Sequence, residues 1–281
     1  MPAVVISAGV ASSSSQNPIP NPLPSGLPPF ALNHARILYD SKLVGAGVTV
    51  SSGSNGAYTL IPNTAQRWTF TGTGSDLIVF LMPANNSTDT VCINAHNLAS
   101  VGATVEIFYS LDASGDFVSF APSQTPTKNN SLMFHIGTAV NARRIQVNIT
   151  NANGSAFVGS INAGVALQMQ RPFFVGHTPA VLAKQADYYS SNTESGNFIG
   201  VEVRRRALES QASWANLSDA WYRAYFVPFL DNAEVLPFVF AWNLSQHPTD
   251  VVYCKNITNI APSYSGPRDV MTVSIPLVGI A

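Results

Sequence analysis

Charged residues, cysteines and long apolar runs are all scarce in this sequence of 281 residues. Asp, Glu, Lys and Arg make up 10% of the chain, against roughly 25% in an average soluble protein, and the formal net charge is −1. Nucleic-acid binding requires clustered Lys and Arg that neutralise phosphates, and the one such run, at residues 204–206, is short. No stretch approaches the roughly 20 apolar residues of a membrane span. We therefore expect neither a nucleic-acid partner nor a membrane-spanning segment.

Two cysteines occur, Cys92 and Cys254, and each lies within an apolar, strand-like run. Such a pair does not resemble the disulfide framework of a small secreted domain. We expect two buried free thiols. The N-terminal apolar run has no basic residue before it, so a signal peptide is not expected.

Local catalytic and metal-binding motifs are absent as well. The five histidines never occur as H-x-H, H-x-x-H or H-E-x-x-H, the spacings that bring two ligands to one metal ion. The nucleophile motif G-x-S-x-G is also missing. Paired acids of the glycosidase kind stay open, because such pairs meet in space and not in sequence. We expect no metal, no cofactor and no enzymatic activity.

The N-terminal residues 1–32 are expected to form an extended arm. Residues 11–30 combine a serine run with several prolines and show no periodicity, a composition that favours an extended, polyproline-like chain. A disordered leader is the alternative. Four apolar residues favour an arm that lies on the surface of a partner; these are Ile19, Leu23, Leu27 and Phe30.

Residues 33–172 show strand after strand with turn signals between them. Residues 105–110 and 144–150 alternate apolar and polar side chains, as half-buried antiparallel strands do. The run "DLIVFLM" at 76–82 is continuously apolar, which predicts a central strand covered on both faces. Turns rich in Gly, Asn and Asp separate the strands. The fold class is therefore mainly β, with a jelly-roll β-sandwich over 33–172.

The stretch "CINAHNLASVGATVEIFYSLDASGDF", residues 92–117, concentrates chemically reactive side chains. A catalytic histidine needs a partner acid or nucleophile, yet the neighbours of His96 are amides and small residues. Asp112 and Asp116 fall in a segment with the composition of a hairpin turn, where carboxylates bond backbone amides. We interpret the stretch as scaffold and not as an active site.

Residues 173–281 follow a different pattern and are expected to form a smaller α+β domain. Leu217, Trp221 and Tyr225 recur at the four-residue spacing of an amphipathic helix. Ser218 is placed as its N-cap and Pro228 as its end. Strand-like runs lie on both sides of this helix.

Two aromatic groups have competing interpretations. Trp68 and Tyr58 are candidates for a sugar-binding face, because planar rings stack on sugars; the alternative is that Trp68 is a core residue. The aromatic density around Trp221 and Tyr225 exceeds what a small core requires, so both are candidates for a protein interface.

The order of several segments resembles a known family. "RWTF", "DLIVFLMP", "DTVCINAHNLASVGATVEIFYSLDASGDF", "NARRIQVNIT" and "SINAGVALQM" resemble the galactose-binding-like β-sandwich, in its discoidin-like form, of structural proteins in tailed-bacteriophage tails. "GNFIGVEVRRR" and "LSDAWYRAYFVPFLDNAEVLPFVFAW" resemble the second half of the same kind of protein. The resemblance covers residues 33–281.

This resemblance implies a distal-tail or baseplate component of the virion, assembled in the cytoplasm of the bacterial host. Copies would form a cyclic ring, such as a hexamer, that links the tail tube to baseplate or fibre proteins, without catalytic residues. The competing hypothesis is a carbohydrate-binding module that recognises a host-surface glycan, with Trp68 and Tyr58 as its candidate contacts.

Overall fold

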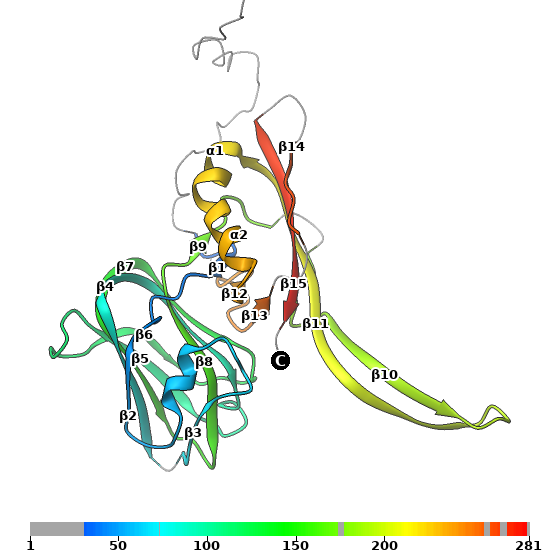
Figure 1. Ribbon diagram of the computed structural model, residues 1–281, viewed down its shortest axis with the longest axis horizontal. Helices are drawn as coiled ribbons and strands as arrows, with labels where there is room; N and C mark the ends of the chain where they lie inside the picture. The colour runs from blue at the N-terminus through cyan, green and yellow to red at the C-terminus, as the bar shows by residue number, and fades with distance from the viewer. Residues whose placement is uncertain (1–30, 73, 174–176, 256–258, 265–268, 280–281) are drawn as a thin grey trace, which may run out of the picture.

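The chain consists of a β-sandwich followed by a second antiparallel sheet that carries one helical segment (Figure 1). The computed structural model describes residues 31–72, 74–173, 177–255, 259–264 and 269–279; at 184–188 and 203–207 it describes the backbone alone. The predicted fold class, a mainly β chain with a jelly-roll sandwich and a smaller α+β unit, is confirmed. The predicted interface residues Ile19, Leu23, Leu27 and Phe30 lie outside the described residues.

The sandwich is built from seven strands and one short 3-10 helix. Its strands are β2 (Gly47–Val50), β3 (Trp68–Phe70), β4 (Ser75–His96), β5 (Thr104–Ser110), β6 (Val118–Gln124), β7 (Leu132–Thr150) and β8 (Ala156–Gly164), and η2 is Gly56–Leu60. Hydrogen bonding follows the order β3-β8-β4-β7-β5-β6, with β2 also on β4.

Two long strands, β4 and β7, contribute to both layers of the sandwich. The first half of β4 pairs with β2 and with the second half of β7, which in turn pairs with β5. The second half of β4 pairs with β8 and with the first half of β7. The register shifts twice between Leu81 and Thr90, which is where such a strand bends from one layer into the other.

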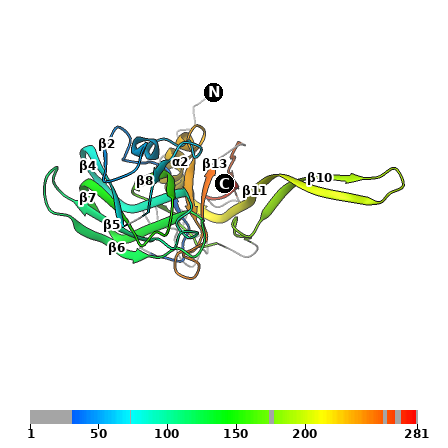
Figure 2. The same cartoon turned by 90° about the horizontal axis from the view of Figure 1, so that it is seen from below.

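The second sheet gathers strands from both ends of the sequence. Its members are β1 (Arg36–Leu38), β9 (Leu167–Gln168), β10 (Lys184–Asn192), β11 (Phe198–Ser218), β12 (Phe238–Ala241), β13 (Val251–Lys255), β14 (Ser263–Tyr264) and β15 (Val270–Gly279). The order is β10-β11-β15-β13-β12-β1-β9, with β14 also on β15. The long ends of β10 and β11 project from the body as a hairpin (Figure 2).

The observed pairing differs from the predicted domain limits of 33–172 and 173–281. Strands β1 and β9 flank the sandwich in sequence but pair with each other and, through β1, with β12. The sandwich therefore begins and ends inside the predicted range. A boundary placed by the change in local pattern cannot detect a pairing between segments some 200 residues apart, such as Arg36 with Ala241.

The helical segment runs from Asp219 to Ala233 as α1 (Asp219–Trp221), the π-helical turn η3 (Tyr222–Phe226) and α2 (Val227–Ala233). The prediction of Ser218 as N-cap is confirmed, because its Oγ accepts a hydrogen bond from the Trp221 N–H at 3.3 Å. The prediction that Pro228 ends the helix is wrong. Pro228 lies in the first turn of α2, directly after the π-helical turn, where the regular bonding is already interrupted and the missing N–H costs little.

Three apolar clusters hold the fold together. One fills the sandwich, including Phe80 and Ile93, and a second lies between the helical segment and the second sheet, including Phe229. The third joins the two units and contains Leu38, Cys92, Met133, Val239, Ala241, Val251 and Tyr253. Both cysteines are buried and free, as expected.

The stretch 92–117 comprises the end of β4, all of β5 and the segment that leads to β6. Alternate residues of β4 point into different cores, Ile93 into the sandwich and Cys92 into the junction, so this part of β4 is covered on both faces. His96 is 4% exposed and its Nδ1 accepts a hydrogen bond from the Leu98 N–H at 3.3 Å. The apolar run 76–82, in contrast, is covered on one face: Ile78 and Phe80 are buried, whereas Leu81 is 39% exposed.

The described residues include no helix that is long and apolar enough to cross a membrane.

The cap of the helical segment generates a stability prediction. The Ser218 hydroxyl also accepts from Gln170 Nε2 at 2.9 Å, and the side-chain Oε1 of Gln170 accepts from the Ser218 N–H at 2.8 Å. Ser218→Ala removes the cap and leaves a buried amide donor without this acceptor. We expect the free energy of unfolding, measured by urea denaturation, to fall by about 1–3 kcal/mol. The exposed Ser190→Ala serves as control, with a change within about 0.5 kcal/mol; equal effects of the two would contradict the assigned cap.

Candidate functional site

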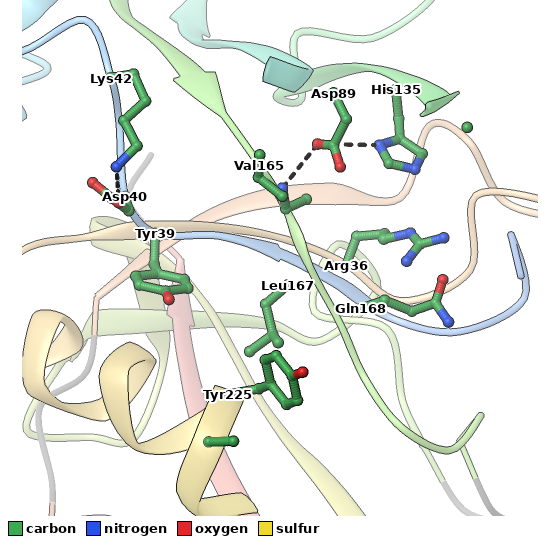
Figure 3. Close-up of a pocket in the computed structure, with 13 residues that line it drawn as sticks. Arg36, Tyr39, Asp40, Lys42, Asp89, His135, Val165, Leu167, Gln168 and Tyr225 are labelled. Carbon is green, nitrogen blue, oxygen red and sulfur yellow. Dashed lines mark hydrogen bonds and ion pairs between the residues drawn. The ribbon is translucent and has the colours of Figure 1, made fainter. Parts of the chain in front are cut away.

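A cleft of about 460 Å³ lies where the sandwich meets the second unit (Figure 3). It is lined by Arg36, Tyr39, Asp40, Lys42, Asp89, His135, Gly137, Val165, Ala166, Leu167, Gln168, Ala224 and Tyr225. The rim is open to solvent, since the Asp40 and Lys42 side chains are 49% and 37% exposed. The floor is closed, since the His135 side chain is 4% and Arg36 2% exposed.

Five parts of the chain build this cleft. Strand β1 and its continuation supply the rim, where Lys42 Nζ donates to Asp40 Oδ2. The end of β8 packs against this continuation so closely that a Cβ at Gly164 would overlap the backbone oxygen of Asp40. The Lys42 N–H donates to the Ala163 carbonyl at 2.7 Å and fixes the contact. The remaining walls come from β4 with β7 and from the helical segment.

Asp89 and His135 line one wall, and the Thr90 hydroxyl links them from behind it. Asp89 Oδ1 accepts from the Ala166 N–H at 2.9 Å and from the Thr90 hydroxyl at 2.7 Å. Because that hydroxyl has a single proton, its contact of 2.8 Å with His135 Nδ1 requires Nδ1 to donate. Neutral His135 therefore carries its proton on Nδ1, and Asp89 ties this wall to the segment between β8 and β9.

Burial shifts the pKa of each charged group on the floor toward its neutral form. It raises the pKa of Asp89, lowers that of His135 to about 4 and lowers that of Arg36 to about 10. His135 is thus neutral at pH 7, and its contact of 3.8 Å with Asp89 is not an ion pair there. Arg36 stays protonated at pH 7, stabilised by the nearby charge of Asp89.

Two tyrosines give the cleft an aromatic side. Tyr39 follows β1, and its ring packs edge-on against Phe229 of α2, with 5.6 Å between ring centroids. Tyr225 belongs to the π-helical turn, and its ring lies near that of Trp221 at 6.3 Å. Figure 3 shows the Tyr225 ring beside Leu167, below Gln168. Both rings are held by core aromatics and are therefore set in place before any ligand arrives.

The structure places the candidate sugar contacts away from this cleft. Trp68 is fully buried on β3, its Nε1–H donates to the Ser52 carbonyl at 3.0 Å, and its ring packs on Phe70. This position corrects its assignment as a sugar-stacking residue, because neither face of the ring is accessible. Tyr58 lies on η2 and is 37% exposed, and it does not line the cleft.

The two described interface candidates have different positions. Trp221, the last residue of α1, is fully buried in the core between the helical segment and the second sheet. Its ring is therefore not accessible to a partner. The aromatic density that suggested a protein interface is largely accounted for by the buried core of this unit. Tyr225 is partly buried and lines the cleft instead.

Sequence reasoning missed the charged floor of the cleft. Arg36, Asp89 and His135 come from three strands and form no local motif. Each does stand within an apolar context, in "ARIL", "TDTVC" and "MFHIG". A single charged residue inside a strand-like run is a usable signal, because such a residue has to be satisfied in the core or point into a site.

A second hollow of about 390 Å³ lies between the loop after β6 and residues 248–249. Its lining includes Thr125, Lys128 and Asn130 but no aromatic side chain. Within the described part of the chain, no cluster of three or more His, Cys, Asp and Glu side chains could hold a metal ion.

Comparison with known proteins gives matches among solved structures alone. No protein-family model matches the chain, and no curated protein matches it. The chain is similar to an F5/8 type C domain from Bacteroides fragilis, with 12% identity, 45% of this chain and 93% of that chain covered, and a TM-score of 0.38. It is similar to a CBM32 module from Clostridium perfringens, in complex with GalNAc-β-1,3-galactose, with 9% identity, 44% and 98% covered, and a TM-score of 0.39.

A third match is to a larger protein, the GH29 fucosidase of Ruminococcus gnavus in complex with fucose. The identity is 16% and the TM-score 0.38; the match covers 45% of this chain, which spans 27% of the length of that one. The structural neighbours are thus discoidin-like and carbohydrate-binding β-sandwich modules. None of the three is a phage tail protein.

The buried histidines predict a loss of stability in acid. The pKa values of His135 and His96 are both lowered to about 4, whereas an unfolded histidine titrates near 6.5. Between pH 6.5 and 4 the unfolded chain therefore binds more protons than the folded chain. As the pH is lowered through this range, the free energy of unfolding should decrease by up to about 1.4 kcal/mol per pH unit for each histidine.

Urea denaturation at pH 7 and pH 5 measures this slope. Asp89 acts in the opposite direction, since the folded chain retains its proton at a higher pH than the unfolded chain, and it offsets part of the loss. We expect His135→Gln to flatten the slope, and an unchanged slope in that variant would contradict the assignment.

Proposed function

We propose that this protein binds a neutral carbohydrate in the cleft between its two units. The observation that carries the proposal is the lining of this cleft, which combines two anchored tyrosine rings with acid, amide and cationic side chains. Its volume of about 460 Å³ falls within the range of small-molecule sites, roughly 300–1,000 Å³.

Aromatic rings and hydrogen-bonding groups are the two requirements of sugar recognition. The flat faces of a sugar stack on rings, which is the role assigned to Tyr225 and Tyr39. The hydroxyl groups need both donors and acceptors. The Gln168 amide group carries both, and the Asp40 carboxylate accepts from the opposite side of the cleft (Figure 3). The second hollow, near Lys128, lacks an aromatic ring and fits a sugar less well.

The balance of charge favours a neutral ligand. Arg36 and Lys42 are opposed by Asp89 and Asp40, and Lys42 is already paired with Asp40. An anionic sugar would have to compete with these carboxylates, and a cationic sugar with the two basic groups. A neutral sugar meets neither cost.

We propose binding without catalysis. Among the described residues that line the cleft there is no serine, threonine or cysteine to act as nucleophile. Asp89 Oδ1 is committed to Ala166 and Thr90, and Asp40 is paired with Lys42. Neither acid is arranged as the proton donor or nucleophile of a glycosidase.

Replacing the aromatic wall tests the site. Tyr225→Leu keeps most of the buried volume but removes the flat ring and its hydroxyl. Isothermal titration calorimetry with GalNAc-β-1,3-galactose and with fucose should show saturable binding of at least one to the wild-type protein, weakened about tenfold or more in the variant. Chitosan oligomers and a polyuronic acid, which carry charge, should bind more weakly than the neutral sugar.

Tyr58→Leu is the matched control, because it removes an exposed tyrosine that does not line the cleft. Its affinity should equal that of the wild type. Loss of binding in Tyr58→Leu but not in Tyr225→Leu would move the site to the sandwich surface around η2. Absence of binding to both neutral sugars at millimolar concentration would refute the proposal.

A structural subunit of a larger assembly is the second candidate function, and the projecting hairpin of β10 and β11 favours it (Figure 2). In this form the protein would be the ring-forming tail-tip or baseplate component of a phage virion that the sequence resembles, in contact with tail tube or fibre proteins. The phage assignment rests on that resemblance alone. A low charge supports assembly in general, because copies repel one another weakly.

A further inference from the structure

The hairpin of β10 and β11 extends well beyond the sheet to which it belongs. In both views it projects from the body, and its far end lies beside no other element (Figures 1 and 2). Strand β11 continues back into the sheet through its pairing with β15 from Leu208 onward, whereas the part from Phe198 to Ala207 pairs with β10 alone. We call residues 189–202 the hairpin tip.

The hairpin tip exposes apolar side chains that a solvated ribbon does not need. Phe198 is 67% exposed, Ile199 63%, Tyr189 53% and Val201 50%. Val201 pairs with Ser190, and Tyr189 with Glu202. Because successive residues of a strand point to opposite faces, Val201 and Tyr189 lie on opposite faces of the ribbon. The hairpin tip is therefore apolar on both sides.

Such a hairpin tip is expected to bury its apolar side chains against another surface. A two-stranded ribbon by itself is marginally stable in water, and exposed Phe and Ile side chains gain free energy when they are covered. The hairpin tip also provides fewer residues than the roughly 20–30 per side that a standard stable interface uses. One hairpin tip against an unrelated partner gives one small contact. If each copy both gives a tip and receives one, every chain takes part in two such contacts.

Charge is compatible with a second copy as the partner. The hairpin tip carries the acids Glu194 and Glu202 and no basic residue, so a strongly acidic partner is disfavoured. The chain as a whole has a net charge of −1 and 10% charged residues, which leaves little repulsion between copies.

We propose that the hairpin tip docks onto a second copy of this chain, with each copy giving one tip and receiving one. This inference deepens the second candidate function, assembly, and is independent of sugar binding. In both a twofold dimer and a closed ring, each copy can give one hairpin tip and receive one. Phe198 and Ile199, the most exposed members, are the anchors of the contact.

Mass in solution tests the proposal on the full chain. Light scattering across a range of concentrations should give a multiple of the chain mass of 29.9 kDa. Phe198→Ser combined with Ile199→Ser should raise the dissociation constant about tenfold or more and shift the protein toward one chain. Val235→Ser combined with Leu111→Ser is the matched control, because both side chains are more than half exposed and lie outside the hairpin.

A wild-type protein that remains one chain at all concentrations, or a double variant in the hairpin tip that keeps the wild-type mass, would overturn the proposal.

Energy transfer gives a second measurement. Ser195→Cys places a single accessible thiol in the hairpin tip, since Cys92 and Cys254 are buried. Donor- and acceptor-labelled copies should show transfer that excess unlabelled protein removes, and absence of transfer would exclude the contact. Affinity for GalNAc-β-1,3-galactose and fucose should be unaffected by the changes in the hairpin tip, so failure of one proposal is distinguishable from failure of the other.

Discussion

The pairing of β1 with both β12 and β9 is the constraint on which the arrangement of the two units depends. Three residues, Arg36 to Leu38, hydrogen-bond to the strand that leaves the sandwich and to a strand near the other end of the sequence. The sandwich strands β2 to β8 thus lie in the sequence between β1 and β9, two neighbouring strands of the second sheet. Leu38 then points into the apolar cluster that joins the units, while Arg36 forms the floor of the cleft. A single short strand positions both the junction and the candidate site.

The buried charges next to that junction are not explained by stability. Moving Arg36 and Asp89 out of water is costly, as the shifts of both pKa values toward the neutral forms indicate. Apolar residues of similar volume commonly give equal or greater stability at such positions. The adjoining cluster around Cys92 and Val239 shows that an apolar junction is available to this fold. A charged floor beneath an open rim is what the proposed binding site would account for, because local rules of packing are relaxed at functional sites.

Local patterns in the sequence were sufficient for the strands and for the helix cap. Alternation over 105–110 and 144–150 predicted half-buried strands, because the rest of the fold covers one face of each. Ser218 was identifiable as the cap because its hydrogen bond to Trp221 is local in the sequence. The joining of the units was not predictable, since Arg36 and Ala241 meet only in the folded sheet. Continuation of the helix past Pro228 depends on the π-helical turn before it, which no short pattern marks. The cleft was missed for the same reason as the junction, because its side chains come from five separate parts of the chain.

The second sheet keeps the two proposed activities apart. Its order places the hairpin strands β10 and β11 at one end and the cleft strands β1 and β9 at the other. Six steps of about 4.8 Å between neighbouring strands separate the ends by roughly 30 Å. The strands between them pack on the aromatic core through Phe238, Phe240 and Ile275. In an assembly held by the hairpin tips, the sugar sites would form a repeated array, whose avidity exceeds that of one site.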